Sequence, residues 1–190
     1  MSLWGNDIKP KNLTDAEKKE VFANTKGWVR EAGSVLSGNG NTSADPEVLV
    51  AIGGLSANMG SANITEIEFV TTSFDKSDGG NIDVRVRFNE PVTVTGTPRV
   101  SITNGNQGSG SGRGPHLANY LSGSTTNELL FRCTIAAGNS ATNANDVLVI
   151  GANATALNSG TIKDTGEGTV ATITNSAGIG TAAGSITVAA

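Results

Sequence analysis

Aliphatic side chains recur at every second position in two stretches of this chain, and this alternation most limits what the chain can fold into. A β-strand sends successive side chains to opposite faces, so a period of two gives a strand one apolar and one polar face. The apolar faces need cover, which predicts packed antiparallel sheets. The apolar positions are Ile82, Val84, Val86 and Phe88 in residues 82–88, and Leu129, Phe131, Cys133 and Ile135 in residues 129–135.

Shorter apolar runs between turn signals predict the other strands of the same domain. Turn-forming sequences such as Asp78-Gly79-Gly80-Asn81 separate them, and the lack of a helical pattern between them argues against a parallel α/β sheet. About eight strands at this spacing favour an antiparallel β-sandwich. The other predicted strands are residues 64–69, 92–94, 100–102, 146–150, 161–163 and 170–174, followed by a small-residue tail over 176–190.

The first 60 residues differ from the rest and predict a separate N-terminal attachment segment, followed by the sandwich domain over 61–190. A capping-box pattern at Thr14 and Glu17 predicts a short helix over 15–22. The apolar run over 48–52 predicts a strand covered on both faces, paired in a hairpin with the segment around Trp28. A piece of this size buries little core, so we expect it to need cover from the second domain or another subunit.

The N-terminal segment also holds the candidate partner-binding residues. Residues 1–30 carry six Lys/Arg and four Asp/Glu, a net of +2 in a chain of net charge −4. Because positive and negative side chains are interspersed, this segment is poorly suited to binding the phosphates of a nucleic acid. We therefore expect its partner to be an acidic protein surface and not a nucleic acid. Tryptophans often anchor interfaces, although Trp28 is predicted to pack inside the protein. The candidate attachment residues are Trp4, Lys9, Lys11, Lys18, Lys19, Trp28 and Arg30.

Residues that could carry chemistry are few, and we expect neither enzymatic activity nor a cofactor. The single histidine, His116, follows a Gly/Ser-rich stretch with Arg113, and both are predicted to make loop contacts. One histidine and one cysteine do not make a usual zinc site, and no Gly-x-Ser-x-Gly elbow supports a triad. Asp75, Asp78 and Glu90 lie near strand ends, where calcium could bind, but they read as turn formers. Cys133 reads as a small core residue.

The sequence also bears on where the protein is made. The first residues lack the pattern of a secretory signal peptide, and no run is long and apolar enough to span a membrane. We therefore expect synthesis in a cytoplasm and assembly into a particle, with no membrane partner.

Residues 82–135 resemble a bacterial immunoglobulin-like repeat of surface adhesins and phage proteins. The resemblance rests on residues 84–98 (VRVRFNEPVTVTGTP), 118–124 (ANYLSGS), 127–138 (NELLFRCTIAAG) and 160–164 (GTIKD), and covers roughly residues 63–175. It implies an immunoglobulin-like antiparallel sandwich and says little about function.

The opening resembles that of virion structural proteins of large contractile-tailed phages such as those of marine cyanobacteria. The matching residues are MSLWGN at 1–6, Lys9-Pro10-Lys11 and Gly27-Trp28-Val29. This resemblance implies a virion protein assembled in the host cytoplasm, and we expect a capsid decoration or cement protein. Its partners would be the major capsid protein or other virion proteins, in a symmetric or multi-copy assembly. The alternatives are a neck, tail or fibre component, or an adhesin-like module that binds host glycans.

Overall fold

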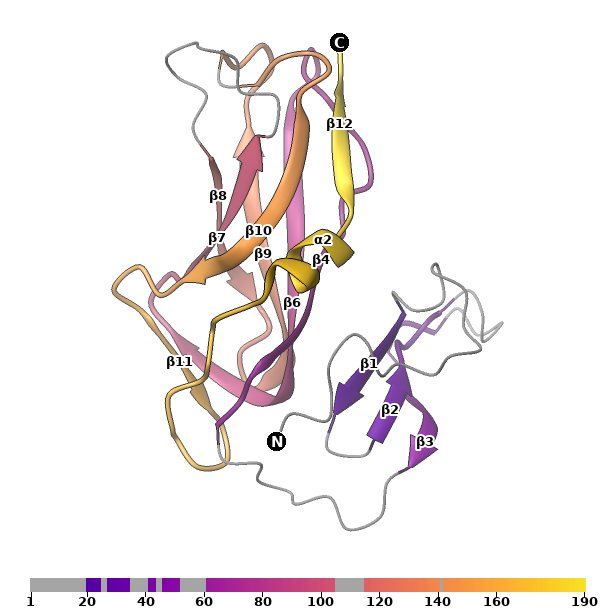
Figure 1. Ribbon diagram of the computed structural model, residues 1–190, viewed down its shortest axis with the longest axis vertical. Coiled ribbons are helices and arrows are strands. Elements are labelled where there is room, and N and C mark those ends of the chain that lie inside the picture. Colours follow the sequence, from indigo (N-terminus) through magenta and orange to yellow (C-terminus); the bar gives the residue numbers. More distant parts are fainter. Residues whose placement is uncertain are drawn as a thin grey trace.

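The computed structural model describes residues 20–24, 27–34, 41–43, 46–51, 61–104, 115–140 and 142–190, and these residues form two sheets. We call the three-stranded sheet near the N-terminus the small sheet and the nine-stranded sheet with its helix the sandwich (Figure 1). The mainly β prediction is confirmed. The one helix among the described residues, α2 (Ala177–Ala182), has six residues, so none of the described helices is long and apolar enough to cross a membrane.

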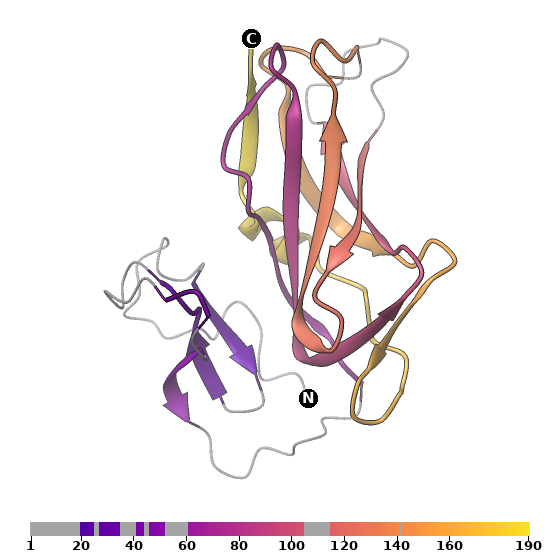
Figure 2. The ribbon, with the colours of Figure 1, turned by 180° about the vertical axis from the view of Figure 1, so that it is seen from behind.

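The sandwich is a single curled sheet whose two halves face each other. β7 and β10 lie on one side and β4, β6 and β9 on the other: β10 is in front in Figure 1, and β6 and β9 are in front in Figure 2, which is seen from behind. The strand order is β11-β6-β9-β8-β7-β10-β12-β5, with β4 paired to β6 beside β11. The strands are β4 (Ile64–Phe69), β5 (Phe74–Asp75), β6 (Gly80–Thr95), β7 (Arg99–Asn104), β8 (His116–Ser122), β9 (Thr126–Ile135), β10 (Val147–Ala156), β11 (Thr161–Asp164) and β12 (Ser185–Ala189).

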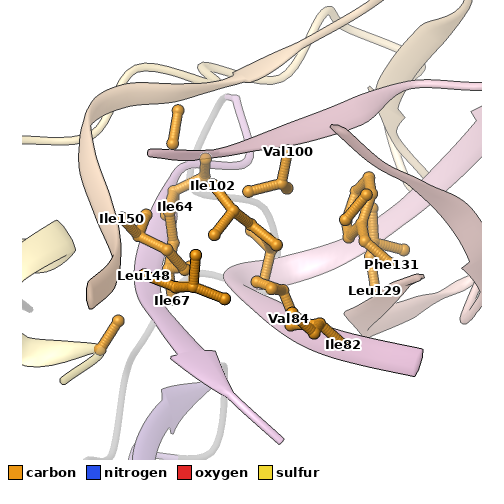
Figure 3. Packing of buried hydrophobic residues seen from close by; sticks show 14 of the residues in the cluster. Ile64, Ile67, Ile82, Val84, Val100, Ile102, Leu129, Phe131, Leu148 and Ile150 are labelled. Carbon is orange, nitrogen blue, oxygen red and sulfur yellow. The ribbon is translucent and has the colours of Figure 1, made fainter. Parts of the chain in front are cut away.

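The core lies between the two halves and consists of the predicted alternating residues. Figure 3 shows Ile67 of β4 beside Leu148 of β10, so side chains from opposite halves meet in one layer. Ile82, Val84 and Phe131 are fully buried there, as the period of two in β6 and β9 requires. Cys133, an unpaired thiol, packs against this core as predicted, and burial raises its pKa.

Three predictions about the strands are wrong in detail. Residues 92–94 are not a separate strand but the continuation of β6. Pro91 does not end the strand, because it lies where the register between β6 and β9 shifts and no ladder hydrogen bond needs its missing N–H. Residues 170–174 make only single bridges, Val170 to Lys163 and Thr172 to Asn63, because this segment crosses from β11 to β4. The predicted tail contains α2 and β12, and β12 pairs antiparallel with β10 and parallel with β5, so the sheet is mixed.

The small sheet consists of β1 (Val21–Asn24), β2 (Gly27–Arg30) and β3 (Glu47–Ala51), all antiparallel. The predicted pairing of the Trp28 segment with the apolar run is confirmed as β2–β3, with Trp28 opposite Val50. The predicted helix over 15–22 is wrong at residues 21 and 22, which begin β1, while residues 15–19 lie outside the described part. Val21 and Phe22 are both buried, one on each face, so tertiary contacts favour a strand there.

The prediction that both faces of the 48–52 run are covered is also wrong. Val48 and Val50 of β3 are 42% and 44% exposed, whereas Leu49 between them packs with Val21 and Trp28. β1 contacts β6 and β4, and both views place β3 on the far side of the small sheet (Figures 1 and 2). β3 is therefore an edge strand with apolar side chains exposed beyond the sandwich.

We expect the core to account for most of the stability of the sandwich, which two leucine truncations test. Leu129→Ala should lower the free energy of unfolding by about 2–5 kcal/mol, because it leaves a cavity at a fully buried site. Leu121→Ala removes the same atoms from a side chain that is 46% exposed and should cost much less. Urea unfolding of both variants measures the difference, and equal losses would contradict the assignment of the core.

Candidate functional site

The outer face of β6 carries charged residues that the small sheet covers. The alternation that sends Ile82, Val84 and Val86 into the core sends Arg85 and Arg87 to the opposite face. That face was predicted to be polar and outward, yet the Arg87 side chain is completely buried. A fully buried arginine is rare unless its charge is paired, so its partners define the most unusual site among the described residues.

Strand register places glutamates on both sides of Arg87. Glu66 on β4 and Glu128 on β9 are the direct cross-strand partners of Arg87, and Glu68 on β4 is the partner of Arg85. Opposite charges at directly paired positions attract each other across the sheet. The guanidinium of Arg87 donates to Glu66 Oε2 at 3.0 Å and to Glu128 Oε1 at 3.0 Å, and its Nη2 lies 3.2 Å from Glu68 Oε1.

The small sheet supplies the remaining partners of the two arginines. Arg87 donates to Glu31 Oε2 at 2.7 Å, and the other oxygen of Glu31 accepts from Arg85. The ring of Phe22 on β1 lies against the guanidinium, 4.7 Å from ring centroid to Cζ, which is a cation–π contact. Glu31 and Phe22 thus join the small sheet to the sandwich. We call Phe22, Glu31, Glu66, Glu68, Arg85, Arg87 and Glu128 the joint.

A glycine turn brings Glu128 into place. Glu128 follows the turn between β8 and β9, where Gly123 has a φ of +106°. A Cβ at Gly123 would lie 2.0 Å from the carbonyl oxygen of Glu128, so only glycine allows this approach. The turn therefore fixes the Glu128 backbone next to β6.

The joint holds more negative than positive charge, and this imbalance shifts its pKa values. The pKa of Glu68 is raised to about 7, mainly by burial; Arg87 and Arg85 oppose the rise, while Glu66 and Glu31 add to it. Burial alone would lower the pKa of Arg87, but Glu68, Glu66, Glu128 and Glu31 outweigh it and raise that pKa above its usual value. With this pKa, Glu68 gains or loses a proton near neutral pH.

A cavity of about 440 Å³ opens beside the joint. Both parts of the protein line it, and Glu31, Arg85 and Glu128 are among its walls. A second cavity of about 260 Å³ also reaches Arg85 and Glu128. Solvent therefore reaches one side of the joint, while Arg87 and Glu66 are sealed on the other side.

A second buried polar cluster surrounds His116 and corrects the prediction that this residue is a loop contact. His116 begins β8 and is buried, and its Nε2 lies 3.0 Å from Thr142 Oγ1. Asp146 accepts hydrogen bonds from the Asn104 side chain and the Asn143 backbone, which orders the 142–146 turn. Thr142 is fully buried and out of reach of a substrate, so the cluster holds strand ends together.

The other predicted site residues are placed as follows. Trp28 is buried in the small sheet, as its sequence context predicted, and Arg30 Nη1 lies 3.6 Å from Glu47 Oε2 on β3. Asp75 accepts hydrogen bonds from the Ser77 backbone and hydroxyl, which makes it a turn former and lowers its pKa. No group of three His, Cys, Asp or Glu side chains in the described part could hold a metal ion. Trp4, Lys9, Lys11, Lys18, Lys19 and Arg113 lie outside the described residues.

Sequence reasoning missed the joint, although one signal for it was present. Glu66 and Glu68 alternate on β4 just as Arg85 and Arg87 alternate on β6, which suggests two strands with complementary charged faces.

Comparisons with protein-family models, with curated proteins and with solved structures found no match for this chain.

Removing the buried guanidinium should be far more costly than removing an exposed one. Arg87→Met leaves four carboxylates of the joint with Arg85 as their one remaining guanidinium and should lower the free energy of unfolding by about 3–5 kcal/mol. Arg132→Met breaks a bidentate pair with Asp83 on the surface and should change it little. Urea unfolding at pH 7 measures both, and addition of Glu66→Gln should restore part of the Arg87→Met loss. Similar losses at the two arginines would be inconsistent with this site.

His116 should make the sandwich less stable in mild acid. Burial lowers the His116 pKa from its ordinary value of 6.5, while Asp146 partly opposes this. A lowered pKa means that the folded state resists protonation, so this contribution is present above pH 6.5 and is lost as the pH falls below it. The advantage in unfolding free energy of the natural protein over His116→Gln should shrink between pH 7.5 and 5. A difference that stays constant over this range would refute the prediction.

Proposed function

We propose that the protein is a non-enzymatic structural protein of a phage virion, a capsid decoration or cement protein. It attaches to the major capsid protein or a neighbouring virion protein through residues 1–60. The sandwich is displayed on the particle or bridges adjacent subunits. Repetition of a modest contact by the symmetry of the particle gives high avidity.

The exposed valines of β3 carry this proposal. Val48 and Val50 lie on the edge strand farthest from the sandwich, and an edge strand with exposed apolar side chains is suited to pairing with a strand of another chain. The opposite edge strand, β1, is used by the joint. The small sheet therefore has one edge for the sandwich and one edge for a partner.

The resemblance of residues 1–6 to virion proteins supports the choice of partner, and the same segment precedes the small sheet in the chain. A neck, tail or fibre position would use the same edge strand. Electron microscopy of labelled particles distinguishes these positions, because label confined to the tail would exclude capsid decoration.

Deletion of residues 1–30 should abolish incorporation into particles and leave the sandwich folded. The buried core residues of the sandwich begin at Ala62, so its circular dichroism should stay β-rich. Incorporation is measured as the protein that cosediments with purified particles. Normal incorporation of the truncated protein would refute the attachment role.

A double substitution, Val48→Lys with Val50→Lys, tests the edge strand itself. It should reduce incorporation at least tenfold, because charged side chains on an edge block strand pairing. Val170→Lys is the matched control, since Val170 is 63% exposed on the sandwich. Equal incorporation of the two variants would remove β3 as the attachment surface.

A further inference from the structure

The joint contains an imbalance of charge that a single proton reduces. The described charged groups that face Glu68 are Arg85 and Arg87 on β6, Glu66 on its own strand, and Glu31 after β2. Glu128 on β9 contacts both arginines from the other side. Counted over the described residues that form the joint, and fully ionised, there are four carboxylates and two guanidiniums, an excess of two negative charges among mostly buried groups. Repulsion between like charges is strong where water is excluded.

The groups of the joint differ in how easily they move. Glu66, Glu68 and Glu128 are fixed by strand register on either side of β6. Glu31 follows the last residue of β2, and among the described residues it is the only carboxylate that the small sheet contributes to the joint. Displacement of Glu31 away from Glu68, together with the small sheet that carries it, is therefore a movement that would relieve the excess negative charge.

The packing around the joint permits this displacement. The cavity of about 440 Å³ lies between the two parts, so water already reaches Glu31. The small sheet has its own buried pair, Val21 and Trp28, which does not belong to the core of the sandwich. Separation of the two parts would leave both of these clusters closed and would expose Phe22, which is buried against Arg87 in the closed joint.

We propose that the joint is a proton-operated latch that holds the small sheet against the sandwich while the glutamate cluster carries a proton and releases it when that proton is lost. The inference does not depend on the partner of the small sheet. It concerns the orientation of the segment that the proposed function assigns to attachment.

The pKa of Glu68 places the working range near neutral pH. In the closed joint this pKa is about 7, and in an open joint exposed to water it returns toward 4.5. The closed state therefore binds a proton more tightly than the open state. Closure is favoured at acidic pH and weakens as the pH rises through 7. Since each pKa unit is a factor of ten, the ratio of closed to open forms should fall on the order of a hundredfold between pH 5 and 8.5.

Hydrogen exchange of the full-length chain between pH 5.5 and 8.5, corrected for intrinsic exchange rates, tests the latch. Amides of β1 and β2 should lose protection above pH 7, while those of β7 and β10 should keep theirs. Glu68→Gln, which imitates the protonated carboxyl, should keep the β1 and β2 amides protected at every pH. The matched control Glu167→Gln, at an exposed turn, should behave like the natural protein.

Three results would overturn the latch: protection that does not vary with pH, pH dependence that persists in Glu68→Gln, or loss of protection in the sandwich at the same pH. The titration midpoint of Glu68, followed by NMR of its carboxyl carbon, tests the latch in the natural protein without any substitution. A midpoint near 7 supports the latch, and a midpoint near 4.5 contradicts it.

Discussion

The two parts of this protein depend on the pairing of one guanidinium. Arg87 has no contact with solvent, and an unpaired charge in that position would cost several kcal/mol. The charge is accommodated because its donors reach carboxylates on β4, on β9 and after β2, and because Phe22 covers its face. The small sheet and both neighbours of β6 are thereby arranged around a single side chain.

Short-range patterns in the sequence predicted most of the sandwich. Ile82, Val84, Leu129 and Phe131 alternate with polar residues, and a strand can satisfy that pattern with only one face inward. Residues 185–189 were missed as a strand because two apolar side chains among small residues give little periodic signal. β12 forms because β10 and β5 lie on either side of it, and that information is tertiary.

The candidate site was less predictable because it is made by contacts distant in sequence. From the sequence, Arg87 is one more charged residue on the outward face of a strand. In the fold it is covered by β1 and Glu31, which lie more than fifty positions earlier in the chain. His116 follows a Gly/Ser-rich stretch, which suggested a loop, yet Thr142 and a neighbouring strand bury it. In both cases a separate segment of the chain buries a polar residue that its local sequence places at the surface. The pattern of residues within one strand cannot predict such a long-range contact.

The position of β12 has a consequence for biosynthesis. This strand is inserted between β10 and the short β5, so the last part of the described chain to leave the ribosome lies within the sheet and not at its margin. Until it arrives, β10 presents an unpaired side and β5 has no neighbour in its ladder. During synthesis the domain therefore passes through a stage with an unpaired strand edge. At that stage, neighbouring nascent chains on one polysome could pair through this edge and aggregate.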